Sequence, residues 1–288
     1  MGTPKISFEF FPPQTLEASF RLWDTVRVLS PMQPEFVSVT YGAGGTTRKL
    51  THEAVTTIGR NYGLDVAAHL TCVNATRAQT MEIVENYAQA GVTELVALRG
   101  DAPKGAERFT AHPEGFASSV DLIEALARDG RFKIRCGAYP EPHPDSADTL
   151  ADVRWLKRKC DAGATSSITQ FFFEAETFFR FRDLCEKEGV RAKIIPGILP
   201  IQGWKGAKRF AQSCGTSIPT WVEEAFASEA AQQNEAPLAH DLCTKLCADL
   251  LDGGVEDLHF YTLNRPTLTG KVCQSLGIAP DLGLDKVA

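Results

Sequence analysis

The sequence of 288 residues contains no uninterrupted apolar run close to the roughly 20 residues that a membrane-spanning helix requires. Its first residues, MGTPKISFEF, lack the basic, apolar and small-residue regions of a signal peptide. Basic residues are in the minority, since 30 Lys and Arg against 36 Asp and Glu leave a net charge of −6. We therefore expect a cytoplasmic protein with no membrane partner and no nucleic-acid partner.

Two nucleotide-binding motifs are also missing. Neither a G-x-G-x-x-G fingerprint nor a Walker A loop occurs, and the glycine-rich segment TYGAGGTTR (40–48) matches neither pattern. If a dinucleotide binds, we expect it to bind elsewhere than on a Rossmann half.

The eight cysteines and six histidines form no metal-binding pattern. Only Cys243 and Cys247 are close neighbours, and their i,i+4 spacing has no matching pair of Cys or His nearby. We interpret the cysteines as reduced core residues and expect no metal site.

The composition is that of a soluble globular protein, with 43% hydrophobic and 23% charged residues. Neither a linker nor a low-complexity segment divides the chain, so we predict one domain over residues 1–288. Short strand-like apolar runs alternate with longer amphipathic stretches along it. Strands are predicted at 6–11, 36–42, 65–72, 93–101, 132–140, 166–173, 193–200 and 257–264.

Helices are predicted between the strands, at 16–30, 48–62, 76–90, 115–129, 147–162, 175–188 and 203–213, with two more in 219–253. Eight strands, each followed by a helix, indicate an α/β fold of the (β/α)8 TIM-barrel type, with extra helices before the eighth strand.

In such barrels the chemistry lies at the C-terminal ends of the strands, and this sequence turns polar at those ends. The polar residues there are Thr40, Tyr41, His69, Thr71, Arg99, Asp101, Tyr139 to His143, Gln170, Asn264 and Arg265. A ring of donors, acceptors and carboxylates around one mouth indicates an enzyme.

The first predicted strand, in KISFEFFPP, carries a carboxylate within an aromatic run. Because strand side chains alternate, Glu9 shares one face with Ser7 and Phe11, while Phe8 and Phe10 take the other. A buried carboxylate is costly unless it is paired or its pKa rises. Glu9 is therefore either a structural partner of a barrel arginine such as Arg99, or an acid with a chemical role.

Three other segments have both a structural and a functional interpretation. LRGDAPKG (98–105) is either a strand-ending turn or a cation and an anion aimed at one ligand, with Gly100 admitting its backbone. AYPEPHPDS (138–146) is a rigid loop or part of a site. LKRKCDAG (156–163) offers three cations, either to solvent or to a phosphate.

The motifs SFEFFPP, VSVTYGAGG, AHLTC, VALRGD, ITQFFF, IIPGILPI and FYTLNRP occur in the same order in methylenetetrahydrofolate reductases. The chain resembles that family from Ser7 to about Leu276. The resemblance implies a TIM barrel that binds FAD non-covalently and reduces 5,10-methylenetetrahydrofolate to 5-methyltetrahydrofolate with NADH or NADPH. It further implies a role in one-carbon metabolism and methionine biosynthesis, a homo-oligomer, and a catalytic domain without an S-adenosylmethionine-binding domain.

The resemblance also implies roles for individual residues. Glu9 and Asp101 match the family's catalytic residues, and Gln170 and Arg265 match folate contacts beside them. Phe210 matches an aromatic residue that stacks against nicotinamide or folate at the substrate site. The implied cofactor contacts, with Thr40 on the nicotinamide, are Thr40, Tyr41, His69, Arg99, Gly100, Asp101, Ala117, Tyr139, His143, Asp152, Arg158 and Lys159.

Three positions depart from the family pattern. Gly206 replaces a glutamine that contacts folate in some bacterial members, and Trp155 replaces an asparagine on the flavin side. The loop 102–115 is longer than in some relatives.

The implied reaction needs a proton donor, and Glu9 is the candidate, because opening the five-membered ring of the substrate requires a proton on N10. A buried glutamate could keep that proton near neutral pH, while an ionised Asp101 beside Arg99 would stabilise positive charge on the pterin. Two alternatives have the same cofactor or ligands: another flavin barrel enzyme of the proline dehydrogenase type, and a non-catalytic folate or flavin carrier.

Overall fold

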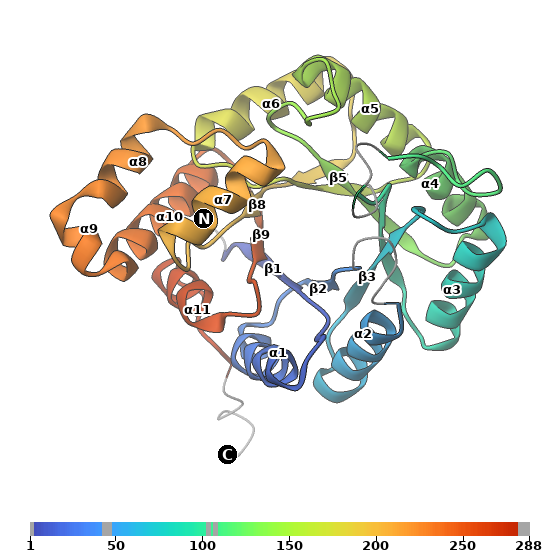
Figure 1. Cartoon of the computed structure of the whole chain (residues 1–288), viewed down its shortest axis with the longest axis horizontal. Coiled ribbons are helices and arrows are strands. Elements are labelled where there is room, and N and C mark those ends of the chain that lie inside the picture. Colours follow the sequence, from blue (N-terminus) through green and yellow to red (C-terminus); the bar gives the residue numbers. More distant parts are fainter. Residues whose placement is uncertain (1–2, 42–47, 102–104, 106–108, 282–288) are drawn as a thin grey trace.

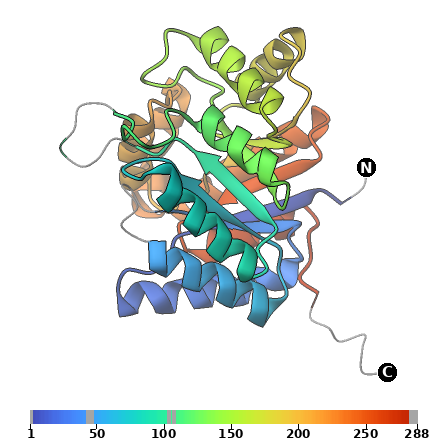
Figure 2. The same cartoon turned by 90° about the vertical axis from the view of Figure 1, so that its right-hand side faces the viewer.

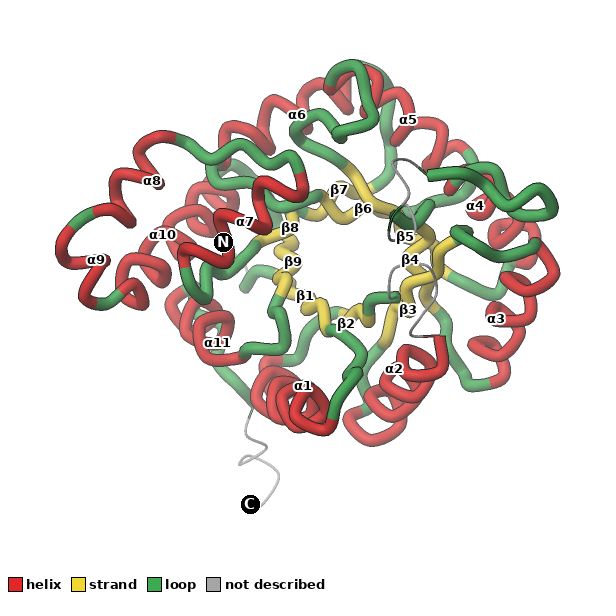
Figure 3. The backbone as a smooth tube through the Cα atoms, viewed as in Figure 1, coloured by secondary structure: helices red, strands yellow, loops and turns green. Residues whose placement is uncertain are grey.

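The computed structural model describes residues 3–41, 48–101, 105 and 109–281. Most of the glycine-rich segment 40–48 and six residues of the loop 102–115 lie outside this part of the chain. Parallel strands form a closed ring with helices around it (Figures 1 and 3), which confirms the predicted (β/α)8 barrel.

The sheet follows the order β7-β6-β5-β4-β3-β2-β1-β9-β8, and every pairing in it is parallel. Its strands are β1 (Lys5–Phe10), β2 (Phe36–Val39), β3 (Val66–Thr71), β4 (Glu94–Leu98), β5 (Lys133–Ala138), β6 (Ser166–Thr169), β7 (Lys193–Ile195), β8 (Gly197–Ile198) and β9 (Asp257–Tyr261).

The predicted seventh strand is split into β7 and β8 at Pro196, which has no N–H for a sheet hydrogen bond. β7 pairs with β6, whereas β8 pairs with β9. The two short pieces therefore close the ring together and act as one barrel strand.

The helices are α1 (Leu16–Leu29), α2 (Arg48–Tyr62), α3 (Arg77–Gln89), α4 (Ser119–Asp129), α5 (Thr149–Asp161), α6 (Ala175–Lys187), α7 (Trp204–Cys214), α8 (Thr220–Ala227), α9 (Glu229–Gln233), α10 (Glu235–Asp252) and α11 (Pro266–Ser275), with a 3-10 turn at Ser30–Met32. In the side view, α1 to α4 (blue to green) cover the strands (Figure 2). The two helices expected in 219–253 are three, α8, α9 and α10, because Ser228 and Asn234 each cap a new helix. None of the helices in the described ranges combines the length and the apolar character that a membrane crossing demands.

Side-chain alternation along β1 sorts its residues as the sequence predicts. Phe8 and Phe10 are fully buried in the outer core between strands and helices, with Leu22 of α1 and Phe260 of β9. Glu9 points to the inside of the barrel, where it lines a cavity. The strand's apolar face thus anchors it, and its other face supplies the carboxylate.

A buried ion pair fills the barrel at the start of the strands. Nη2 of Arg135 lies 2.6 Å from Oε2 of Glu94, and Nη1 donates to Oγ of Ser166. The guanidinium also lies 3.6 Å from the ring centre of Phe36. This layer closes one end of the barrel, so that the opposite end holds the cavity.

Candidate active site

The main cavity lies at the C-terminal ends of the strands and has a volume of about 770 Å³. Strand ends and the segments after them bring together residues as far apart in the sequence as Glu9 and Leu263. Nine predicted site residues line it: Glu9, Thr40, Tyr41, His69, Asp101, Tyr139, His143, Gln170 and Phe210. Val96, Ile168, Tyr261 and Leu263, which the sequence did not single out, supply part of its wall.

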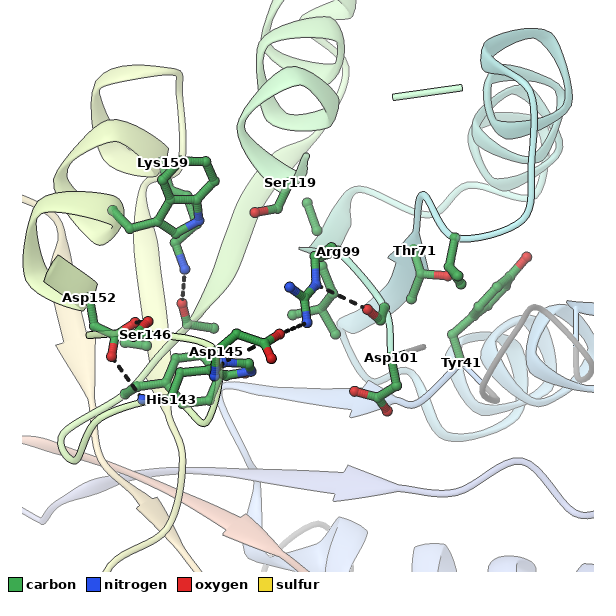
Figure 4. Close-up of a pocket in the computed structure, with 18 residues that line it drawn as sticks. Tyr41, Thr71, Arg99, Asp101, Ser119, His143, Asp145, Ser146, Asp152 and Lys159 are labelled. Atoms are coloured by element: carbon green, nitrogen blue, oxygen red, sulfur yellow. Dashed lines mark hydrogen bonds and ion pairs between the residues drawn. The ribbon is translucent and has the colours of Figure 1, made fainter. Parts of the chain in front are cut away.

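A side lobe of about 310 Å³ extends from this cavity toward α4 and α5 (Figure 4). Tyr41, Asp101, Tyr139 and His143 border both spaces, so the two are continuous. The lobe adds four more predicted residues, Arg99, Gly100, Asp152 and Lys159, and also Trp155.

A third space of about 410 Å³ is bordered by Phe210 and Leu263, which it shares with the main cavity. Arg265 and Gly206 line it. Nothing lies within 4 Å of the position of a Cβ on Gly206, so the missing side chain leaves open room here.

Two predicted cofactor contacts line none of these three spaces. The backbone N–H of Ala117 donates to Oδ2 of Asp121 at the start of α4. Arg158 is exposed on α5, and its guanidinium lies 4.4 Å from the ring centre of Trp155.

Glu9 and His69 lie in direct contact in the main cavity, with Oε2 of Glu9 3.5 Å from Nε2 of His69. Their side chains are 12% and 9% exposed. Burial raises the pKa of Glu9 to about 8 and lowers the pKa of His69 to about 3. At neutral pH both groups are therefore uncharged, and Glu9 carries a proton next to the cavity.

A second polar pair lies on the same inner face of β1 and β9. Oγ of Ser7 is 2.8 Å from Nδ1 of His259, whose ring stacks on Phe36. Burial also lowers the pKa of His259 to about 3. The strand register puts Tyr261 opposite Glu9, and the Tyr261 hydroxyl donates to the Thr169 carbonyl at 2.6 Å.

Arg99 does not pair with Glu9, contrary to the structural interpretation of that glutamate. Its Nη2 lies 2.9 Å from Oδ2 of Asp145, and its Nε donates to the Gly100 carbonyl. It makes no ion pair with Asp101 either, among the described residues. Sequence reasoning missed Asp145, although it stands in the acidic, proline-rich loop 138–146.

The loop 138–146 is organised by Asp152 of α5. Oδ2 of Asp152 accepts from the backbone N–H of His143 at 2.8 Å, and Oδ1 accepts from the Ser146 hydroxyl. The His143 ring meets Tyr139 edge-on, with 4.7 Å between ring centres. Burial, followed by the nearby Arg99, lowers the pKa of His143. Asp152 thus acts here by holding the loop against the side lobe.

Gly100 occupies a position that only glycine fits. Its φ is +88°, and a Cβ would lie 2.8 Å from Cγ1 of Val73 and 3.0 Å from Cβ of Thr71. The missing side chain lets the backbone after β4 form the wall of the side lobe.

Lys159 is a buried cation at the side lobe, with 6% exposure. Its Nζ donates to the Gly137 carbonyl, but it makes no ion pair with the carboxylates that the structure describes. A buried cation without a compensating charge fits an anionic group in the lobe.

Two buried polar atoms have no hydrogen-bond partner in the described part of the chain: Thr71 Oγ1 at the lobe and His69 Nε2 at the main cavity. They fit a bound polar group as well.

The mouth of the main cavity carries aromatic and amide groups. Phe210 of α7 is 38% exposed and stacks on Phe171, with 5.3 Å between ring centres. Gln170 follows β6 directly, and its Oε1 accepts from the backbone N–H of Phe171. These groups can cover a flat ligand bound above Glu9.

Comparison with known proteins agrees with this arrangement. The family model for methylenetetrahydrofolate reductase matches residues 1–277. The chain belongs to the methylenetetrahydrofolate reductase family. It is 41% identical over 286 residues to the 5,10-methylenetetrahydrofolate reductase of Pectobacterium carotovorum subsp. carotovorum, covering 98% of this chain and 93% of that protein. The Escherichia coli K12 protein of the same name is 42% identical with the same coverage.

A plant member of the family is longer. Methylenetetrahydrofolate reductase (NADH) 1 of Arabidopsis thaliana is 35% identical over 297 residues, which cover 98% of this chain and 49% of the plant protein. Among solved structures, a Clostridium thermocellum protein that binds two copies of 5-methyl-5,6,7,8-tetrahydrofolic acid matches with a TM-score of 0.59. It covers 96% of this chain and 95% of its own, at 14% identity, and therefore supports the fold alone.

Proposed function

We propose that this member of the methylenetetrahydrofolate reductase family is an FAD-dependent oxidoreductase that reduces 5,10-methylenetetrahydrofolate to 5-methyltetrahydrofolate with NADH or NADPH. The observation that carries the proposal is the buried position of Glu9, which lines the main cavity 3.5 Å from Nε2 of His69, so that burial raises its pKa to about 8. The proposed role, which the resemblance to the family implies, is in one-carbon metabolism and methionine biosynthesis, in the cytoplasm and as a homo-oligomer.

The residues of the cavity and its side lobe fit FAD, a flat ring system joined to a diphosphate and a second base. Tyr41, Tyr139 and His143 border both spaces, and Arg99 and Lys159 supply positive charge in the lobe. FAD, when bound, supplies the hydride chemistry, while the protein contributes orientation and electrostatics.

Glu9 holds the proton that the folate substrate needs. Cleavage of the bond between N10 and the one-carbon unit leaves an iminium at N5, and N10 must gain a proton as that bond breaks. Burial keeps Glu9 protonated up to about pH 8, so this proton is present at neutral pH.

Asp101 would supply a negative charge opposite the positive charge on the pterin. It lies at the end of β4, borders both spaces and is exposed. Because Arg99 is paired with Asp145, the carboxylate of Asp101 is left to face the positive charge that develops on the pterin. Gln170, Phe210 and Arg265 would then hold the pterin and its tail.

One anaerobic experiment tests the proposal against the two alternatives. The purified protein, reduced with NADH or NADPH, should lose its flavin colour and regain it on addition of 5,10-methylenetetrahydrofolate. Reoxidation by the cyclic imine formed from proline, and not by the folate, would identify a proline dehydrogenase type of enzyme. Binding of both ligands without any change of colour would indicate a carrier.

A further inference from the structure

The third space of the site, of about 410 Å³, has a mostly apolar lining with two polar side chains. The apolar part consists of Leu199, Pro200, Ala207, Phe210 and Leu263. Among the described residues that line the space, Gln202 and Arg265 alone carry polar side chains. Walls of this kind suit a flat ring that carries an amide and a carboxylate, because few polar groups then fix its orientation.

Gln202 lies at the outer end of this space. It also lines a neighbouring space of about 720 Å³ between α10 and α11, and this neighbouring space shares no lining residue with the main cavity. Phe210 and Leu263, which the third space shares with the main cavity, mark its inner end. A ligand group that meets Gln202 therefore belongs to the part of the ligand that extends away from Glu9.

The side-chain amide of Gln202 is only loosely held. Its Nε2 donates to the Arg265 carbonyl at 3.3 Å, a long hydrogen bond, and its Oε1 accepts none from the described residues. The residue is half-buried and stands directly before the start of α7. The amide can therefore exchange its present bond for one to a ligand at little cost.

Gly206 makes this amide the available one. Position 206 is the place where some bacterial members of the family carry a folate-contacting glutamine, and here nothing lies within 4 Å of the Cβ position. Gly206 and Gln202 line the same space, four positions apart in the sequence. The chain thus lacks a side-chain amide at one point of the wall and has one at a neighbouring point.

We propose that Gln202 hydrogen-bonds the benzoylglutamate tail of the folate in the third space, in place of the contact that position 206 cannot make in this chain. The inference rests on the proposed function and adds a substrate-binding residue to it. Gln202 holds the tail and takes no part in the chemistry at Glu9.

The test follows reoxidation of the reduced flavin at increasing concentrations of 5,10-methylenetetrahydrofolate. This gives the apparent dissociation constant of the folate and the limiting rate separately. The variants are Gln202→Ala and the double variant Gln202→Ala with Gly206→Gln. Gln274→Ala is the control, because Gln274 is an exposed amide on α11 that lines the neighbouring space and not the third one.

Gln202→Ala should raise the apparent dissociation constant of the folate by about 3- to 10-fold, the size of one hydrogen bond. The limiting rate, and flavin reduction by NADH or NADPH, should stay within about 2-fold of the parent. Adding Gly206→Gln should restore the affinity, since a glutamine there has open room in the same wall. Gln274→Ala should match the parent.

Three results would overturn the role of Gln202 while leaving the proposed function in place. They are an unchanged folate affinity in Gln202→Ala, an equal loss in both half-reactions, and a loss that Gly206→Gln does not restore. The last two would show that Gln202 acts only by joining the start of α7 to Arg265. A parent protein whose reduced flavin is not reoxidised by the folate would overturn the proposed function itself, and this inference with it.

Discussion

Oε2 of Glu9 lies 3.5 Å from Nε2 of His69 inside the barrel mouth, and neither group is charged at neutral pH. Their closeness therefore does not amount to an ion pair. Burial moves the two pKa values in opposite directions, to about 8 for the carboxyl and about 3 for the imidazole. The site holds a proton on the carboxyl group because burial disfavours charge on either side chain.

The first prediction concerns stability against pH. The pKa of Glu9 is raised on folding, so its contribution to the free energy of unfolding is full below about pH 4.5 and is lost as the pH rises toward 8. Between pH 5 and 7.5 the loss approaches about 3 kcal/mol at ~1.4 kcal/mol per pH unit. In Glu9→Gln this fall should be absent.

Denaturant unfolding at several pH values measures the effect, with Glu176→Gln as the control, since Glu176 is exposed on α6. At pH 7.5, Glu9→Gln should be at least as stable as the parent. A loss of about 3–5 kcal/mol in the variant at every pH would instead indicate a broken buried ion pair at Glu9.

The second prediction concerns the histidine. His69→Ala leaves a gap beside Glu9 that admits water, and the pKa of Glu9 should fall from about 8 toward its ordinary value of 4.5. The alkaline limb of the pH profile of the folate half-reaction should then move to lower pH. His240→Ala serves as the control, because His240 lines none of the three connected spaces. An unchanged limb in His69→Ala would show that His69 does not shield Glu9.

The third prediction concerns Gly100. Gly100→Ala should lower the free energy of unfolding by about 1–3 kcal/mol. The residue has a positive φ, and the added Cβ would lie too close to the side chains of Val73 and Thr71. Gly130→Ala shares the positive φ, but nothing lies within 4 Å of its Cβ position, so it should cost less. Thermal unfolding of both variants gives the comparison, and equal losses would mean that the contacts at Gly100 are easily relieved.

The fourth prediction concerns the order of binding. One cavity holds Thr40, Gln170 and Phe210, so we expect NAD(P)H and folate to use it in turn. Initial-rate plots against one substrate at several levels of the other should be parallel lines. Intersecting lines, with a ternary complex seen in binding experiments, would place the two substrates in separate sites.

The (β/α)8 barrel could be predicted from the sequence, because strands and helices differ in the period of their hydrophobic residues. It also placed Glu9 correctly, since alternation along β1 sends Phe8 and Phe10 outward. The pairing of Arg99 with Asp145 was not predictable, because it joins segments 46 positions apart. The burial of Lys159 was not predictable either. It is one of three consecutive cations at positions 157–159, and it alone among them is buried.

The central claim is that Glu9 is the proton donor to the folate, and stopped-flow flavin absorbance of Glu9→Gln tests it most directly. Flavin reduction by NADH or NADPH needs no proton from Glu9 and should proceed at nearly the parent rate. Reoxidation by 5,10-methylenetetrahydrofolate should slow by about 10²–10⁴-fold, the contribution typical of general acid catalysis. Equal slowing of both half-reactions, or reoxidation at the parent rate, would contradict the assignment of Glu9 as the acid.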